Sequence, residues 1–264
     1  MYGSETSDWV VKYYDLAFGI SGEHELAWYL DKVEASGGPV LDLACGTGRL
    51  ALKIAEMGYE VVGVDHSEGM LKHFQDALGK EPVRVQKRIS LVKQPMARFN
   101  LNQKFKSVIC SDAFFHNLTV ADEISCLQHI ADHLMPKGRL FFNLPNPNCD
   151  FILKSEESTG DEFELRGKYN LKDGSGVLVV EQSNHGDAQN QTVTTHLRFT
   201  LLDEKGKEID RKMSSWRSRY LFPYEVVHLL VRCGFRVKAL VGDYQNGPVE
   251  KGSQLIFDAE LNVV

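Results

Sequence analysis

The chain has 264 residues, of which 43% are hydrophobic and 25% charged, and its formal net charge at pH 7 is −6. This composition is ordinary for a globular protein and excludes disorder of the whole chain, while the acidic balance disfavours nucleic-acid substrates. The absence of an apolar run of ~18 residues excludes a membrane-spanning helix, and five scattered cysteines without a CxxC pair predict reduced thiols in a cytoplasmic protein.

The first half of the chain predicts helices and strands in alternation. Apolar residues at helical spacing predict one helix over 8–18 and a second from Ser21 to the Gly-Gly-Pro sequence at 37–39. Short apolar runs then predict five strands, at 40–44, 61–64, 83–92, 107–111 and 139–144. Amphipathic helices lie between them, and Ser67 and Thr119 are suited to cap two of these helices. This alternation predicts a parallel sheet with helices on both faces.

Residues 146–221 interrupt the alternation and predict antiparallel strands. Turn sequences separate these strands, at 172–176, 186–190 and 204–206, and apolar side chains alternate between the turns. After Pro223 the α/β pattern returns with one helix and two strands. We therefore expect a core domain of residues 1–145 and 222–264, and an inserted antiparallel subdomain that acts as a lid, a substrate platform or a dimerisation surface.

The segment 40–50, VLDLACGTGRL, predicts a ligand-binding turn. An apolar strand leads through Gly46 and Gly48 into a helix, and glycines allow a tight turn that a ligand can touch. Asp65 ends the next strand, 19 residues after Gly46, where a carboxylate can accept hydrogen bonds from both ribose hydroxyls. The pair predicts a nucleoside at the carboxyl ends of the strands.

Three interpretations of this turn compete. Gly46, Gly48 and Ala51 satisfy a loose dinucleotide pattern, which would make the chain an NAD-dependent oxidoreductase. Asp42 favours S-adenosylmethionine instead, because a carboxylate here would repel a pyrophosphate and attract an ammonium group. The third interpretation is a tight turn without a ligand.

Four segments, 40–50, 61–71, 95–118 and 133–144, resemble those of the class I S-adenosylmethionine-dependent methyltransferases. Two later segments, 218–237 and 240–248, resemble a bacterial subgroup that includes N-methyltransferases of amino sugars and of peptide natural products. The resemblance implies an α/β, doubly wound, mostly parallel seven-stranded sheet with an inserted antiparallel sheet. In the subgroup that inserted sheet roofs the active site and often joins subunits, so a homodimer is expected through it.

The implied activity is transfer of a methyl group, by in-line displacement, to a nitrogen or oxygen of a small molecule or short peptide. S-adenosylmethionine would be the donor and S-adenosylhomocysteine the product. Proximity and orientation supply most of the acceleration in such a reaction. The alternative is a protein of the same fold that binds the donor without catalysing transfer.

The resemblance assigns cofactor contacts to residues near the strand ends. They are Tyr14, Asp42, Ala44, Gly46, Gly48, Arg49, Asp65, His66, Met70, Met96, Ala97 and Ser111. Two positions depart from the family pattern. Ala44 replaces a common glycine, a mild change if its φ is negative, and Pro95 replaces an Asp that binds the adenine amino group. Adenine recognition should therefore depend on Met96, Ala97 and apolar walls.

Candidate catalytic groups follow the fourth core strand. His116 is the candidate base because histidine titrates near neutrality, and Asp112 and Asn117 are candidates to orient an amine. The alternative for His116 is a polar loop residue that contacts backbone. Phe115 is a candidate substrate wall or a core residue.

Arg219 and Tyr220 match an Arg-Tyr pair of the subgroup and are candidate substrate contacts for an acidic group. A solvated or interface strand is the alternative for that segment. His129 and His133 have the i, i+4 spacing of metal ligands, but no third ligand lies nearby, so we expect a solvated helix face and no metal.

Overall fold

The computed structural model describes residues 8–18, 23–171 and 173–262. By its contacts the chain divides into two units. Residues Met1–Ile20 and Asn148–Arg219 form the first, which we call the antiparallel unit. Residues Ser21–Pro147 and Tyr220–Val264 form the second, the α/β unit. This division differs from the expected boundaries at the N-terminus, because the first helix joins the antiparallel unit.

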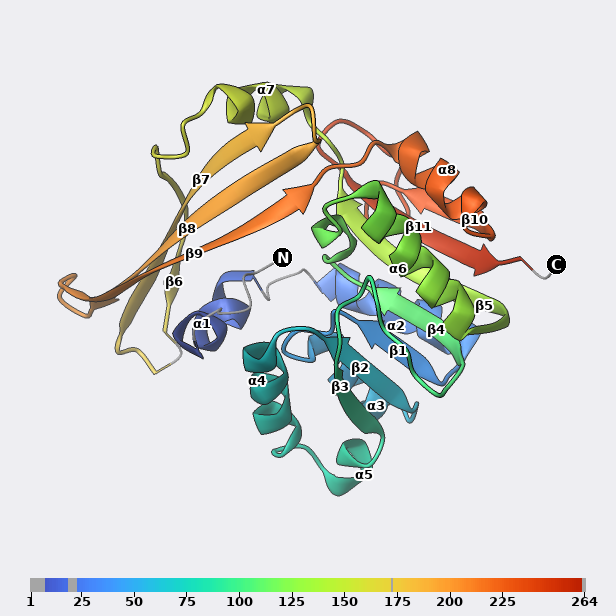
Figure 1. The fold of residues 1–264 in the computed structure, drawn as a ribbon. Helices are drawn as coiled ribbons and strands as arrows, with labels where there is room; N and C mark the ends of the chain where they lie inside the picture. Colours follow the sequence, from blue (N-terminus) through green and yellow to red (C-terminus); the bar gives the residue numbers. More distant parts are fainter. Residues whose placement is uncertain (1–7, 19–22, 172, 263–264) are drawn as a thin grey trace. The chain divides into compact units, whose positions relative to one another are not determined.

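The α/β unit is built on a seven-stranded sheet with the order β10-β11-β5-β4-β1-β2-β3 (Figure 1). Its strands are β1 (Val40–Leu43), β2 (Val61–Asp65), β3 (Ile89–Lys93), β4 (Phe105–Cys110), β5 (Leu134–Pro145), β10 (Phe235–Val241) and β11 (Gln254–Leu261). Strands β3, β2, β1, β4 and β5 pair in parallel, and β11 runs antiparallel to both of its neighbours. The predicted doubly wound, mostly parallel sheet is confirmed.

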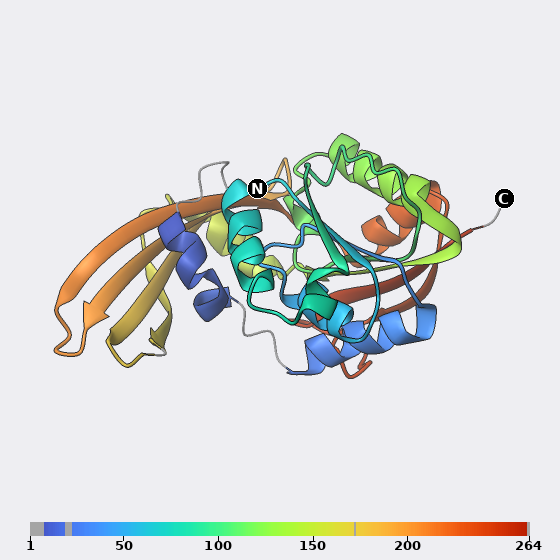
Figure 2. The same ribbon diagram turned by 90° about the horizontal axis from the view of Figure 1, so that it is seen from below.

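Helices cover both faces of this sheet because successive strand residues point to opposite sides. On one face α6 (Val120–His133) and α8 (Pro223–Arg232) pack in a cluster that includes Leu41 and Leu43. The other face carries α2 (Glu23–Ser36), α3 (Arg49–Glu56), α4 (Glu68–Leu78) and the short α5 (Val83–Gln86). Figure 2 shows α2 and α6 on opposite sides of the sheet. Asp42, between Leu41 and Leu43, therefore points to the side of α3.

The two expected helix caps are confirmed. Ser67 Oγ accepts a hydrogen bond from the Met70 N–H at 3.3 Å, and Thr119 Oγ1 accepts one from the Asp122 N–H at 3.1 Å. The strand expected over 83–92 is wrong in its first half, which forms α5 before β3 begins. The physical reason is Pro82, whose carbonyl accepts hydrogen bonds from the N–H groups of Val85 and Gln86 and so starts a helical turn.

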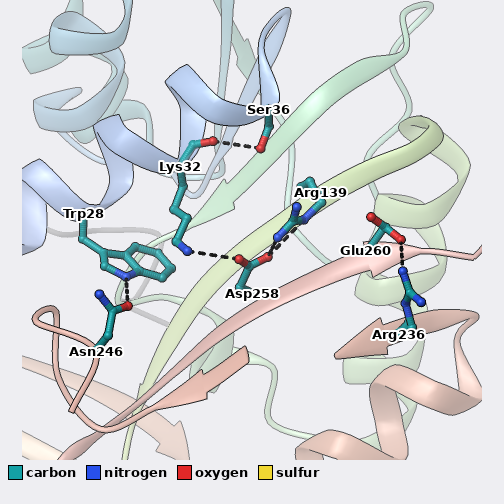
Figure 3. A network of polar contacts seen from close by, with 8 residues as sticks. All are labelled: Trp28, Lys32, Ser36, Arg139, Arg236, Asn246, Asp258 and Glu260. Atoms are coloured by element: carbon teal, nitrogen blue, oxygen red, sulfur yellow. Dashed lines mark hydrogen bonds and ion pairs between the residues drawn. The ribbon is translucent and has the colours of Figure 1, made fainter. Parts of the chain in front are cut away.

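Polar contacts fasten α2 to the far strands of the sheet (Figure 3). Lys32 Nζ lies 3.2 Å from the buried Asp258 Oδ2, and Arg139 pairs with the other oxygen of the same carboxylate. Trp28 Nε1 donates to Asn246 Oδ1 at 3.3 Å. Helix α2 is therefore held by β5, β11 and the segment between β10 and β11.

The antiparallel strands that the sequence predicts are confirmed, and they form a four-stranded sheet in chain order. Its strands are β6 (Glu164–Asn170), β7 (Gly176–Asp187), β8 (Thr192–Asp203) and β9 (Glu208–Arg219). The expected alternation on β8 is confirmed, since Leu197 and Phe199 are fully buried. Helix α7 (Cys149–Glu157), which the sequence analysis did not predict, lies beside β7.

Helix α1 (Asp8–Phe18) packs on this sheet. Its residues Val10, Tyr13 and Ala17 share a helix face and are buried in one cluster with Leu178 and Phe199. An amphipathic helix needs an apolar partner, and within the antiparallel unit β7 and β8 provide one.

All five cysteines are free thiols. No helix within the described ranges has both the length and the apolarity that a membrane span requires. The cytoplasmic location and the joining of subunits through the antiparallel sheet stay predictions.

A short 3-10 turn, η1 (Phe114–His116), follows β4 and leads to the candidate site.

Candidate functional site

Glycines without side chains leave the backbone of the turn from β1 into α3 open to a ligand. Gly46 and Gly48 have φ of +55° and +87°, and a Cβ at Gly48 would lie 2.3 Å from the Phe74 ring. Glycine is therefore required at Gly48 for both conformation and space. Ala44 has φ of +60°, so the condition for a mild glycine replacement is not met. This left-handed conformation costs an L-residue roughly 1–2 kcal/mol.

Asp65 connects this turn to the turn that leads from β2 into α4. Its Oδ2 accepts a hydrogen bond from the Gly46 N–H at 2.9 Å, and its Oδ1 accepts one from the Ser67 N–H at 2.8 Å. His66 Nδ1 lies 3.5 Å from the same Oδ1. Met70 follows in the first turn of α4 and is buried. The structure thus gathers these predicted cofactor residues at the carboxyl ends of β1 and β2.

Asp42 is buried behind the turn, with 3% of its surface exposed. Burial raises the pKa of its carboxyl to about 7, and the charge of Asp65 adds to the rise. Arg49 and a hydrogen bond from the Ala51 backbone oppose it. A carboxyl that titrates near neutrality responds strongly to any cation placed beside it.

An ion pair that the sequence analysis missed lies beside the same turn, between the buried Glu25 and the partly buried Arg49. Arg49 Nη2 donates to Glu25 Oε1 at 2.7 Å, and Ser111 Oγ donates to the same oxygen at 3.0 Å. Glu25 is 3% exposed, and burial raises its pKa while Arg49 lowers it. Its sequence signal was its place on the buried face of α2, three residues before Trp28. Arg49 and Ser111, both expected to contact the cofactor, are thus engaged with Glu25.

Asp112 is held in a defined position after β4. It has φ of +48°, its N–H donates to Asn143 Oδ1 at 2.9 Å, and Asn143 Nδ2 donates to Asp112 Oδ1 at 2.5 Å. Tyr29 OH donates to the same Asn143 Oδ1 at 2.8 Å. Asn143 and Tyr29, both buried, were also missed by the sequence analysis. They orient the carboxylate that was expected to orient an amine.

The other two candidate catalytic residues, His116 and Asn117, are buried. Asn117 is 2% exposed, and its Nδ2 donates to the Phe114 carbonyl at 3.0 Å and contacts Met96 Sδ at 3.4 Å. His116 is 9% exposed, and its ring centroid lies 4.6 Å from that of Phe115. The structure therefore brings Asn117 to Met96, one of the predicted adenine contacts. Ala97, the other, is buried beside it in the chain.

Two expected contacts belong to the antiparallel unit. Tyr14 lies on α1, and Arg219 ends β9, where its guanidinium hydrogen bonds to Gln191. Tyr220 begins the returning α/β segment, with its ring 6.1 Å from that of Phe222. The binding roles of Tyr14, Arg219 and Tyr220 stay predictions.

The histidine pair on α6 differs from its expectation. His133 is 5% exposed, so the solvated face expected for it is wrong. Its Nδ1–H donates to the His129 carbonyl at 2.6 Å, and its Nε2 accepts from the Leu101 N–H at 2.8 Å. Both ring nitrogens of His133 therefore hydrogen bond to backbone groups, so neither is available to bind a metal with His129.

The charges around the turn fit a cationic nucleoside. Four carboxylates and one guanidinium form an interacting set there: Arg49 interacts with Glu25, Asp42 and Asp112, and Asp42 interacts with Asp65. Such a set repels a pyrophosphate and attracts a ligand that carries an ammonium and a sulfonium group. The residues present therefore fit S-adenosylmethionine.

Comparisons with known proteins agree with this fit. Residues 40–138 match a family model described as a methyltransferase domain. The chain is similar to the putative methyltransferase YqeM of Bacillus subtilis, with 26% identity over 226 residues that cover 84% of each protein.

Solved structures with the same fold are also methyltransferases. An S-adenosylmethionine-dependent methyltransferase from Clostridium acetobutylicum has a TM-score of 0.77 at 18% identity, over 97% of this chain and 99% of its own. The glycopeptide N-methyltransferase MtfA, in complex with S-adenosylmethionine, has a TM-score of 0.57 at 26% identity, over 92% of this chain and 96% of its own.

Proposed function

We propose that this chain, which is a class I S-adenosylmethionine-dependent methyltransferase, transfers a methyl group to a nitrogen atom of a small molecule or short peptide. The donor is S-adenosylmethionine and the product S-adenosylhomocysteine. Support for nitrogen comes from the likeness to a glycopeptide N-methyltransferase. An oxygen acceptor is the alternative outcome of the test below.

The observation that carries this proposal is the excess of carboxylates around the glycine turn. The donor, when bound, supplies a methyl group already activated on a positively charged sulfur. The chain's own residues then need only bind, orient and exclude water, which can supply a large part of the acceleration. In this proposal Gly46, Gly48 and Asp42 receive the methionine half, and Asp65 accepts from the ribose.

The acceptor side is assigned to residues after β4. Asp112, fixed by Asn143, orients the acceptor amine, and His116 accepts its proton when the amine arrives protonated. Phe115, whose ring lies against His116, forms part of the wall. These assignments rest on the fixed geometry of Asp112 and on the position of η1 at the carboxyl edge of the sheet.

Calorimetric titration and an acceptor screen test the proposal. We expect S-adenosylmethionine to bind and NAD not to bind, and mass spectrometry to detect one added methyl group on members of an amine library. Asp65→Asn should weaken donor binding by about 1.5–3 kcal/mol, because charge-assisted hydrogen bonds are lost.

The matched control is Glu68→Gln, which removes an exposed acid from the start of α4 and should leave donor affinity unchanged. Donor binding without transfer to any amine, alcohol or thiol would support a catalytically silent protein. Transfer to alcohols alone would replace the nitrogen acceptor by an oxygen acceptor.

A further inference from the structure

Glu25 determines how much positive charge the protein itself places at the donor site. Arg49 is stabilised by three carboxylates, those of Glu25, Asp112 and Asp42, and pairs directly with Glu25 at 2.7 Å. Glu25 is buried, whereas Arg49 keeps 30% of its side-chain surface exposed. The guanidinium is therefore neutralised by a carboxylate from α2, a helix outside the glycine turn.

The position of Glu25 is fixed from three sides. Its Oε1 accepts from both Arg49 and Ser111, so the side chain links the start of α3 to the end of β4. Helix α2 is itself held to the sheet through Lys32 and Asp258. Glu25 cannot move away from the turn without breaking these contacts, so its charge acts at a constant place.

The two ligands of a methyltransferase differ in one charge. At neutral pH S-adenosylmethionine carries a sulfonium, an ammonium and a carboxylate, whereas S-adenosylhomocysteine has lost the sulfonium charge and keeps all other recognition groups. A protein charge near the turn therefore changes the affinity of the donor relative to the product. The groups that both ligands share, including the carboxylate, contribute equally to both affinities and so do not change the ratio of the donor affinity to the product affinity.

We propose that Glu25 is a specificity-determining residue that makes this site prefer the donor, which carries a net positive charge, over the product, which carries no net charge. The inference rests on the proposed methyltransferase function and deepens it. With Glu25 ionised, the four carboxylates outweigh Arg49 and the site favours a cation. Without Glu25, fewer carboxylates balance the positive charge of the Arg49 guanidinium. The affinity for the donor then falls, whereas the affinity for the product changes less. A high donor-to-product ratio helps the product leave after transfer.

The test is the ratio of two dissociation constants, measured by calorimetry at pH 8 with S-adenosylmethionine and S-adenosylhomocysteine. Glu25→Gln preserves the shape and an oxygen acceptor for Arg49 and Ser111. We expect the donor-to-product affinity ratio to fall about tenfold, which is the effect that Coulomb's law gives for one charge at a separation of about 12 Å and an effective dielectric constant near 20. Arg49→Met should change the same ratio in the opposite direction, because it removes the compensating cation.

The matched control is Glu260→Gln, which removes the same charge from β11, where Glu260 pairs with Arg236 of β10, and should leave the ratio unchanged (Figure 3). A purely structural Glu25 would weaken both ligands by the same factor, and that result overturns the proposal. Equal ratios in wild type and both variants also overturn it. Failure of the wild type to bind either ligand would instead overturn the methyltransferase function itself.

Discussion

At the residue scale, the burial of Asp42, a proposed contact of the donor, opposes stability. Its carboxyl is buried on the α3 side of β1, where burial raises the pKa from 3.8 to about 7. The ionised form is therefore unfavourable in the folded protein without a ligand. A cationic donor would relieve this penalty, so a residue that weakens the free protein strengthens the complex.

Asp42→Asn should stabilise the free protein at alkaline pH. A folded-state pKa above the unfolded value means that the wild type loses stability as the pH rises from about 4 to about 7. Asparagine does not titrate, so the melting temperature of the variant should exceed that of the wild type most at pH 8 and least at pH 4. Thermal melts at both pH values measure this difference.

Donor affinity at pH 8 should fall in the same variant, because the negative charge is gone. Asp76→Asn, which neutralises an exposed acid on α4, serves as the control and should shift neither the melts nor the affinity. If Asp42→Asn were less stable than the wild type at pH 8, the buried, ionised carboxylate of Asp42 would not destabilise the free protein.

The site was predictable where its residues share one local motif. Gly46, Gly48 and Asp65 follow strand ends, and their spacing alone indicates the turn and the acid beside it. Asn143 and Tyr29 were missed because they meet across 114 residues of sequence, which no local pattern reports. The left-handed φ of Ala44 was missed because a non-glycine residue gives no sign of that conformation.

At the scale of elements, helix α1 shows that an amphipathic pattern predicts a buried face but not the surface that covers it. The helix was predicted correctly over 8–18, yet its apolar face contacts the antiparallel sheet and not the core to which it was assigned. Similarly, the apolar residues at 83–92 were predicted to form one strand, and the first of them form α5 after Pro82 instead. Caps at Ser67 and Thr119 were predictable because they act within one turn.

Val10→Asp should destabilise the antiparallel unit. Val10 is 1% exposed in the cluster with Leu178 and Phe199, so the variant would bury an unpaired carboxylate. We expect a loss of at least about 3 kcal/mol and faster hydrogen exchange in β7 and β8. Lys12→Asp, on the exposed side of the same helix, is the control. Unchanged exchange in Val10→Asp would show that α1 does not stabilise this sheet.

At the scale of the molecule, the contacts of Asp258 hold α2 to two strands distant in sequence (Figure 3). Its carboxylate is 4% exposed, and it pairs with Lys32 of α2 and Arg139 of β5. Two partly buried cations depend on this one acid. The arrangement matters beyond stability, because α2 also carries Glu25 and Tyr29.

Asp258→Asn should lower the free energy of unfolding by about 3 kcal/mol, because both cations would lose their anionic partner. Urea denaturation measures this loss. Glu260→Gln, two residues further along β11, removes an exposed pair and should change stability little. Equal effects of the two variants would show that burial of Asp258 contributes nothing to the strength of its pairs.

The place of β11 has a consequence for biosynthesis. This strand is the last of the chain, yet it lies inside the sheet between β5 and β10. A nascent chain that has formed β5 therefore exposes an unpaired edge until Gln254 and the residues after it leave the ribosome. At elongation rates of about 5–20 residues per second this interval lasts roughly ten seconds, long enough for chaperones to bind the open edge. Strands β6–β9 of the antiparallel unit, which are synthesised between β5 and β11 and pair in chain order, can fold during that interval.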